Sequence, residues 1–159
     1  MNISSDKVSD SEARKRRDAY RGTHRWCWVP VQDKASGLWH PCLKEPAIVE
    51  HTARQRGTEI GESVANYFPM CDFPVGDHHQ GWKHNGSKSS PGEAKARLIM
   101  FAVKLLVREA SPLEVAMLLD GRKWWDKTMP ETASLQDVLL LECQSLYSII
   151  SLREFKGSR

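Results

Sequence analysis

The apolar and polar positions in the last third of the chain repeat with the period of α-helices. Helices are predicted over 91–109, 112–119 and 134–154, and the first two share a start signal of serine, proline and a later glutamate. In the first of them the apolar stripe consists of Leu98, Phe101, Ala102, Leu105 and Leu106. Its basic residues are expected on the opposite, solvated face: Arg97, Lys104 and Arg108. Short links between three such helices predict a bundle, so 90–155 is expected to form the core.

A basic helix is predicted near the N-terminus. Ser9 and Glu12 have the spacing of a capping box and Gly22 ends the pattern, so the helix is expected over 10–21, after a frayed 1–8. Basic residues crowd this end of the chain: Arg14, Lys15, Arg16, Arg17, Arg21 and Arg25. Such clusters attract phosphates or acidic partners through Coulomb attraction and counterion release. A solvated helix that only keeps the protein soluble explains them equally well.

A β-hairpin rich in tryptophan is predicted next, completing a segment over 9–45. Tryptophan and β-branched residues flank a short glycine-containing loop at 33–37. A symmetric loop pairs Val31 with Leu38 and Cys27 with Cys42, and side chains then alternate between two faces. One face carries Cys27, Val29, Val31, Leu38, His40 and Cys42, and the other carries Trp26, Trp28, Pro30, Trp39, Pro41 and Leu43.

The middle of the chain has weaker signals. A helical pattern over 46–68 places four apolar side chains on one face: Ile60, Val64, Tyr67 and Phe68. Residues 69–90 have no usable period and predict a long loop that contains histidines. We therefore expect an α+β fold in a single domain over 1–159, with a C-terminal three-helix core, an N-terminal helix and a packed β-hairpin.

The composition is that of an ordinary globular protein. Hydrophobic residues make up 40% and charged residues 27% of the 159 positions, and the formal net charge of +3 selects no partner. No apolar run is long enough to cross a bilayer, and the first ten residues lack the apolar stretch of a signal peptide. We therefore expect a cytoplasmic protein with no membrane partner and with free thiols.

One face of the predicted hairpin carries potential metal ligands. Cys27, His40 and Cys42 project from it, and the loop can supply a fourth ligand from His78, His79 or His84. Zinc accepts such mixed sulfur and nitrogen ligands. The chain has no C-x-x-C knuckle, however, and two cysteines on one face also pack as small apolar side chains. Zinc is the one cofactor that the sequence suggests, and the alternative is none.

Asp77, His78 and His79 are adjacent in the long loop. This trio is similar to a metal-dependent nuclease centre, in which one histidine activates water and another group holds the cation. A centre of the HNH kind needs a further histidine on a helix downstream, and no histidine follows His84. A solvated loop without catalytic function is the alternative.

A helix-turn-helix is a further interpretation of the C-terminal part. The helix over 111–120 is followed by Gly121 and by a basic segment at 122–127, whose Arg122 and Lys123 would touch bases or phosphates. Trp124 and Trp125 in the same segment are bulky for a helix that reads a groove. An ordinary connection between helices is the alternative.

The tryptophans of the hairpin suggest a binding platform. Trp26, Trp28 and Trp39 share a face beside the basic helix, where bases could stack, where a protein could dock, or where the core could cover them. The sequence favours a small non-catalytic accessory or regulatory protein that binds nucleic acid or a nucleoprotein partner through this helix and hairpin. Two alternatives stay open. One is a protein–protein interaction module or an inhibitor of a host protein, encoded by a mobile element, and the other is a metal-dependent nuclease-like enzyme that uses the loop with Asp77, His78 and His79.

Overall fold

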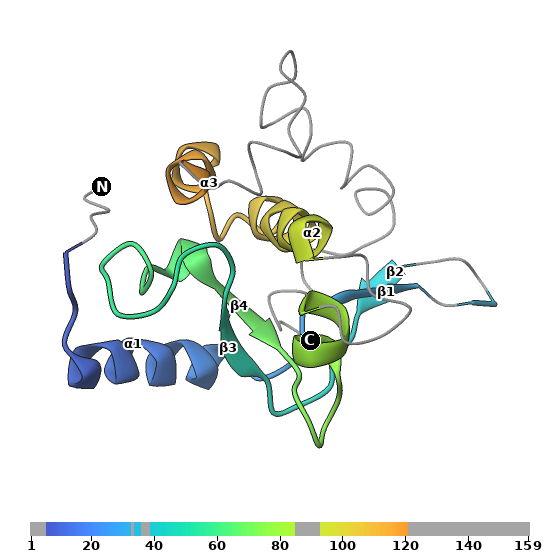
Figure 1. Ribbon diagram of the computed structural model, residues 1–159. Coiled ribbons are helices and arrows are strands. Elements are labelled where there is room, and N and C mark those ends of the chain that lie inside the picture. Colours follow the sequence, from blue (N-terminus) through green and yellow to red (C-terminus); the bar gives the residue numbers. More distant parts are fainter. Residues whose placement is uncertain (1–5, 33, 36–38, 85–92, 121–159) are drawn as a thin grey trace, which may run out of the picture.

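The computed structural model describes residues 6–32, 34–35, 39–84 and 93–120, and the fold is given for these residues (Figure 1). In chain order the elements are α1 (Asp10–Thr23), β1 (Pro30–Gln32), β2 (Trp39–Pro41), β3 (Ile48–His51), η1 (Val64–Asn66), β4 (Tyr67–Met70), η2 (His78–Lys83), α2 (Glu93–Leu106) and α3 (Pro112–Leu119). Helices and two small antiparallel hairpins make a mixed α+β fold, as predicted. The predicted helix over 134–154, and with it the three-helix core, lies outside the described residues.

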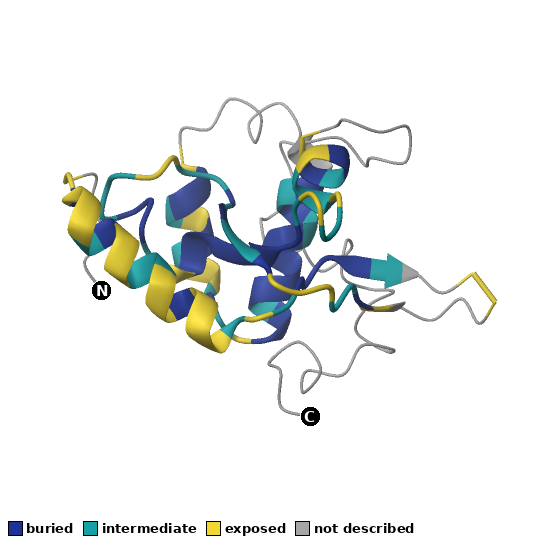
Figure 2. Cartoon of the chain, turned by 90° about the horizontal axis from the view of Figure 1, so that it is seen from below, coloured by how far each residue is buried: buried dark blue, intermediate teal, exposed yellow. Residues whose placement is uncertain are grey.

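Helix α1 begins where the capping signal predicts it. The Ser9 side chain accepts a hydrogen bond from the Glu12 backbone N–H at 3.2 Å, which satisfies a donor that a helix start leaves open. The helix continues through Thr23, beyond its predicted end, and exposes one side to solvent (Figure 2). Residues 1–8 are not frayed throughout, because Lys7 forms a β-bridge with Thr58.

The first hairpin, β1 and β2, has a different register from the predicted one. Val31 pairs with His40, so the predicted pairing of Val31 with Leu38 is wrong by two residues. The connection over 33–38 has six residues, as many as the predicted pairing leaves between Val31 and Leu38, but the turn is centred one residue later in the chain. Because a shift of two residues preserves the alternation of side chains, Cys27 and Cys42 still lie on one face.

The second hairpin, β3 and β4, lies where the sequence predicts a helix over 46–68. Glu50 pairs with Phe68, and His51 pairs with Tyr67. β-Branched and aromatic residues suit such strands, and all four residues of β4 are buried. The prediction of a structureless 69–90 is also wrong in part, because 78–83 form a short π-helical turn, η2.

Helix α2 is buried on two sides and separates two hydrophobic clusters. Met100 and Val103 pack with Trp28 and Phe68 on one side. Leu98, Phe101 and Ala102 pack on the other side with α3, whose predicted capping box at Ser111 and Glu114 is confirmed. Lys104 was expected on a solvated face and is instead fully buried, where it bonds to the Glu109 carboxylate and to the Val64 carbonyl.

The second hairpin is held between helices (Figure 1). Helix α1 packs along β3, and α2 packs against η2, so the hairpin and the π-helical turn are fixed from both sides. The first hairpin projects from this body, as both views show (Figures 1 and 2). None of the helices in the described part of the chain combines the length and the apolar character that a bilayer crossing requires.

Candidate metal centres

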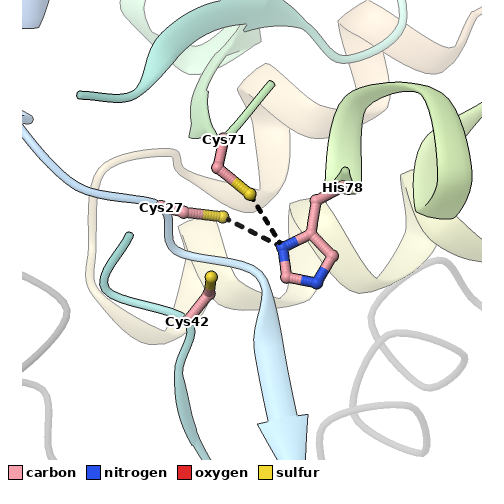
Figure 3. A group of neighbouring side chains, drawn as sticks. All are labelled: Cys27, Cys42, Cys71 and His78. Atoms are coloured by element: carbon pink, nitrogen blue, oxygen red, sulfur yellow. Dashed lines mark hydrogen bonds between the residues drawn. The ribbon is translucent and has the colours of Figure 1, made fainter. Parts of the chain in front are cut away.

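Three cysteines and one histidine converge from separate elements, and we call them the sulfur cluster: Cys27, Cys42, Cys71 and His78. Cys27 precedes β1, Cys42 follows β2, Cys71 follows β4, and His78 is the first residue of η2. Their four candidate ligand atoms all lie within 4.8 Å of one another. The four side chains point toward a common centre (Figure 3).

The spacing of the sulfur cluster fits a tetrahedral zinc ion. His78 Nδ1 lies 3.4 Å from Cys27 Sγ and 3.3 Å from Cys71 Sγ. Zinc with bonds of about 2.3 Å to sulfur and about 2.1 Å to nitrogen separates such atoms by about 3.6 Å. Cys27 and Cys71 are buried and all three thiols are free of disulfides. The cluster can therefore hold a metal ion with little rearrangement.

The electrostatics of the sulfur cluster also suit a cation. Burial raises the pKa of the Cys27 thiol, whereas hydrogen bonds from Cys27 and Cys42 lower the pKa of Cys71. Burial alone lowers the pKa of His78, but hydrogen bonds with the sulfurs of Cys42 and Cys71 outweigh it and raise that pKa to about 9. In the absence of a metal these shifts place a Cys71 thiolate beside a protonated His78, and a metal ion that binds here takes the place of that proton.

The backbone explains why distant cysteines meet. The Cys27 N–H donates to the Lys44 carbonyl, and the Cys42 N–H donates to the Val29 carbonyl, so the two chain segments are paired beyond the first hairpin. Gly76 leaves room for Cys71, because a Cβ at Gly76 would lie 2.5 Å from Cys71 Sγ. The loop after β4 is therefore shaped around this sulfur atom.

The sequence predicted part of this cluster. Cys27, Cys42 and His78 come together as expected, but His40 does not join them, because its exposed ring turns back onto the Pro41 carbonyl at 2.8 Å. The sequence argument missed Cys71. Its only signal was that it precedes His78 by seven residues, inside a segment that was predicted to be a loop.

A second group lies next to the first, and we call it the carboxylate cluster: Glu50, His79 and His84. Glu50 Oε2 is 2.7 Å from His79 Nε2 and 3.9 Å from His84 Nε2. Glu50 is buried in β3, and both histidines belong to η2 or its C-terminal cap. One carboxylate and two imidazoles are ligands that Mn²⁺, Ni²⁺ and Zn²⁺ all accept.

The carboxylate cluster has the outer contacts of a metal site. Asp72 Oδ2 lies 3.3 Å from His79 Nδ1, so a carboxylate orients the ring and leaves Nε2 toward Glu50. Such carboxylate–histidine pairs are the usual support of histidine ligands. The buried Lys83 ammonium bonds to the other Glu50 oxygen at 3.0 Å and to the His51 carbonyl at 3.1 Å. Glu50 is therefore held with Oε2 toward the histidines.

His51, the residue after Glu50, is held by a buried carboxylate. Its Nε2 lies 3.2 Å from Glu62 Oε2, and Glu62 also accepts hydrogen bonds from the Tyr67 hydroxyl at 2.7 Å and the Gly57 N–H at 2.8 Å. Burial lowers the pKa of His51 despite the nearby carboxylate. The ring is thus uncharged at neutral pH, and Nδ1 has no hydrogen bond to any residue in the described ranges.

Asn66 fixes the loop that follows His51. Its Oδ1 accepts from the backbone N–H groups of Ala53 and Arg54, at 2.9 and 3.1 Å. Its Nδ2 donates to the carbonyls of Arg54 and Gly61, at 2.8 and 2.9 Å. The side chain is fully buried. These four bonds hold the chain from 52 to 61 in one conformation.

The carboxylate cluster and His51 line one open cleft of about 550 Å³. The lining also includes five cationic side chains: Arg17, Arg54, Arg56, Lys83 and Arg97. Among the described residues that line it, Glu50 is the only carboxylate. A cleft whose lining has this excess of positive charge attracts anions to the side of the candidate metal site.

The other predicted site residues are placed as follows. Arg17 lines the cleft and contacts Glu62 at 3.4 Å, whereas Arg16 pairs with Glu59 and Arg21 with Asp18. Three predicted basic residues are exposed and contact neither cluster: Arg14, Lys15 and Arg25. Asp77 is exposed and belongs to neither cluster. Arg122 and Lys123 lie outside the described residues.

The predicted tryptophan platform is corrected at Trp28. Only 2% of Trp28 is exposed, and its ring packs edge-on against Phe68 with centroids 6.2 Å apart. The ring fills the core, so no base can stack on it. Trp26 is half-buried against the same cluster, and the side chain of Trp39 lies outside what is described.

No family model, no curated protein and no solved structure matches the chain. The function therefore has to be inferred from the two clusters and the cleft. The observation that matters most is that Glu50 and His51 are adjacent in β3, while His78 and His79 are adjacent in η2. Glu50 belongs to the carboxylate cluster and His51 contacts Glu62, whereas His78 belongs to the sulfur cluster and His79 to the carboxylate cluster.

Proposed function

We propose that the protein is a metal-dependent hydrolase that cleaves phosphodiester bonds in nucleic acid. A divalent cation would be held by the carboxylate cluster, and His51 would act as the general base. The observation that carries this proposal is the cationic cleft, whose lining includes Glu50, His51, His79 and His84. The three residues of the candidate metal site, a histidine with a lowered pKa and several cationic residues all line the same cleft.

A cation at the carboxylate cluster would supply Lewis acidity. Bound to a phosphate oxygen, it would stabilise the charge that develops as the phosphodiester is attacked and would bind the leaving oxygen. Three protein ligands leave coordination positions for water and substrate. The cluster also opens to solvent, because His84 is exposed.

His51 has the properties of a general base. Its Nε2–H is directed to Glu62, so in the neutral ring Nδ1 carries the lone pair that can accept a proton from water. Glu62 would stabilise the imidazolium that forms, as the carboxylate of a catalytic triad does. The lowered pKa of His51, caused mainly by burial, keeps the ring ready to accept a proton at neutral pH.

The charge of the cleft favours a polyanionic substrate. Arg17, Arg56 and Arg97 line it, and Arg14 is exposed about one turn before Arg17 on α1. This retains nucleic acid as the partner that the sequence suggested, but makes it a substrate. A tryptophan platform is no longer required, which agrees with the burial of Trp28.

The positions of the histidines in the structure also bear on the absence of a histidine after His84, which in the sequence argues against an HNH kind of centre. That argument placed His78 and His79 before a helix and looked for a further histidine downstream. In the structure His79 lies in η2 and His84 is its C-terminal cap, while the remaining groups, Glu50 and His51, lie upstream in the second hairpin. The missing downstream histidine therefore does not count against a nuclease.

We propose further that the sulfur cluster binds zinc in a structural role. It offers four protein ligands from four chain segments and is largely buried, as in closed structural sites. Such a site leaves no position for substrate. Metal analysis of protein purified without a histidine tag should find one equivalent of zinc, and Cys42→Ser should lose it.

The nuclease proposal is tested by cleavage assays on the full chain. The protein is incubated with Mg²⁺, Mn²⁺, Ni²⁺ or Zn²⁺ and with supercoiled plasmid, linear duplex DNA, single-stranded DNA or RNA. Cleavage should require the cation, and His51→Ala should lower its rate about 100-fold or more without weakening Mn²⁺ binding. Glu50→Gln should weaken Mn²⁺ binding as well as cleavage.

The matched control is His40→Ala, which removes an exposed histidine outside both clusters and should leave the rate unchanged. Wild-type protein that cleaves none of these substrates, or His51→Ala with the wild-type rate, would overturn the proposal. Salt-dependent binding without cleavage would favour the non-catalytic nucleic-acid-binding protein instead. Absence of both, with a protein partner that co-purifies, would favour the interaction module.

A further inference from the structure

We propose that the sulfur cluster controls the cation affinity of the carboxylate cluster, so that zinc at the first site assembles the second. The coupling runs through the dipeptide His78–His79, which gives one ligand to each site. The inference rests on the proposed function only for the use of the second site. Its test reads cation binding, so it can fail or succeed independently of nuclease activity.

The two histidines face different clusters from the first turn of η2. His78 Nδ1 lies 3.3 Å from Cys71 Sγ, whereas His79 Nε2 lies 2.7 Å from Glu50 Oε2. Because they are consecutive residues, a shift of the backbone at one of them changes the position of the other. A change in the geometry of one cluster therefore changes the geometry of the other.

A second connection runs through Cys71 and Asp72. The Cys71 carbonyl accepts a hydrogen bond from the His79 N–H at 3.0 Å. The next residue, Asp72, holds His79 Nδ1 through its carboxylate at 3.3 Å. A ligand of the sulfur cluster thus positions the backbone of His79, and the residue beside that ligand orients its ring.

The two sides of the carboxylate cluster are held by different elements. Glu50 lies in β3, where it pairs with Phe68, and Lys83, the last residue of η2, is bonded to it. His79 and His84 instead depend on η2, a turn of six residues whose first residue is His78. Zinc bound by Cys71 and His78 would hold the start of this turn against the end of β4.

The expected consequence is preorganisation of the second site. With zinc in the sulfur cluster, His79 and His84 are held near Glu50 before any cation arrives. Without zinc the first turn of η2 loses its anchor at His78, although Lys83 and α2 still hold its other end, and ordering His79 then costs part of the binding free energy of the second cation. Contacts that orient metal ligands typically change metal affinity about 10- to 100-fold, and we expect a change in this range.

The experiment measures Mn²⁺ binding through the electron paramagnetic resonance signal of free Mn²⁺. Two samples of the full chain are compared, one with one equivalent of zinc and one from which zinc has been removed. Zinc at one equivalent fills the sulfur cluster, because thiolates select it over the carboxylate site. Removal of zinc should raise the Mn²⁺ dissociation constant about tenfold or more. Since coupling is reciprocal, Mn²⁺ should strengthen zinc binding by the same factor.

Two variants at one position separate anchoring from a general loss of structure. His78→Ala should lose zinc and bind Mn²⁺ weakly, whereas His78→Cys keeps four zinc ligands and should retain zinc with nearly wild-type Mn²⁺ affinity. His40→Ala is the matched control and should change neither metal. Circular dichroism follows the fold of each protein.

Three results would overturn the inference. The first is equal Mn²⁺ affinity with and without zinc, and the second is equal Mn²⁺ affinity in His78→Ala and the wild type. The third is global unfolding of the zinc-free wild type, because zinc would then act on the whole fold. The hydrophobic cluster formed by α2 and α3, which includes Phe101 and Leu118, contains no sulfur ligand and should keep the zinc-free chain folded.

Discussion

His24 Nε2 lies 2.6 Å from Glu109 Oε2, and this contact ties the end of α1 to the segment between α2 and α3. The same carboxylate accepts a hydrogen bond from the Tyr20 hydroxyl at 2.6 Å and from the Lys104 ammonium. Lys104 also donates to the Val64 carbonyl at 2.7 Å. Glu109 therefore joins α1 and α2, and Lys104 extends the contact to η1, the turn before β4.

Glu109 should make the stability of the protein sensitive to acid. Burial opposes its ionisation, but hydrogen bonds from His24 and Tyr20 and the charge of Lys104 outweigh burial and lower its pKa from 4.5 to about 2. A carboxyl group with a lowered pKa stabilises the folded state above its unfolded pKa, and this stabilisation is lost as the pH falls through the folded pKa. The shift corresponds to about 3 kcal/mol.

Glu109→Gln tests this expectation by urea denaturation over a range of pH. At pH 7 the variant should be less stable by about 3 kcal/mol, and the difference from the wild type should shrink as the pH falls from about 4.5 toward 2. Any metal lost at low pH is lost by both proteins and largely cancels in the difference. Glu45→Gln, at an exposed carboxylate, is the control. A difference that is independent of pH would contradict the role given to the charge.

The elements that the sequence predicted correctly carry their signals within a few residues. α1 and α3 start at Ser9 and Ser111, where the capping serine and the following residues are adjacent in the chain. The mixed α+β class follows from these helices and from the tryptophan-rich hairpin. Local patterns of this kind do not depend on what packs against them.

The second hairpin could not be read from the chain, because its pairing is not local. β3 has four residues, and its partner β4 begins sixteen positions after β3 ends, at Tyr67. The residues Ile60, Val64, Tyr67 and Phe68 also match helical spacing by coincidence, although only the last two are in a strand. Without β3 there was no reason to link Glu50 and His51 to the loop histidines.

The candidate metal sites were predicted only as far as residue types allow. The sequence singled out Cys27, Cys42 and the histidines near 78–84, and the structure gathers most of them. It could not supply Cys71, Glu50 or the burial of Lys104. Burial of a charged group is decided by partners such as Glu109 that are distant in space until the chain folds.

Gly76→Ala should disturb the sulfur cluster. A Cβ at this position would lie 2.5 Å from Cys71 Sγ and 3.0 Å from Lys44 Cδ, so the sulfur atom has to move. We expect zinc affinity to fall about 10-fold or more, measured by competition with a chromophoric chelator. Gly22→Ala is the matched control, because a Cβ there meets nothing within 4 Å. Equal zinc affinity of Gly76→Ala and the wild type would show that Cys71 is not a ligand.

Asn66→Ala should destabilise the loop that forms one wall of the cleft. It leaves two backbone N–H groups and two carbonyls without their buried partner, at Ala53, Arg54 and Gly61. The expected cost is about 3–5 kcal/mol in the free energy of unfolding, measured by urea denaturation. Ser63→Ala, which removes one half-buried hydroxyl from the same segment, should cost less than about 1 kcal/mol. Similar costs for both would mean that the loop does not depend on Asn66.

Glu62→Gln separates the general base from the metal site. The carboxylate accepts from His51 Nε2 and is fully buried, and it touches none of the ligands of the carboxylate cluster in the part of the chain described. Glutamine has the same shape but cannot stabilise an imidazolium with a full negative charge. We therefore expect kcat for nucleic-acid cleavage to fall about 10-fold or more while the Mn²⁺ dissociation constant stays unchanged.

The control for Glu62→Gln is Glu59→Gln, three residues earlier, because Glu59 pairs with Arg16 at the surface of α1 and has no contact with His51 among the described residues. Its kcat should be that of the wild type. If Glu62→Gln weakens Mn²⁺ binding and cleavage in proportion, Glu62 supports the metal site instead. If it changes neither, His51 does not depend on this carboxylate, and the assignment of Nδ1 as the proton acceptor loses its basis.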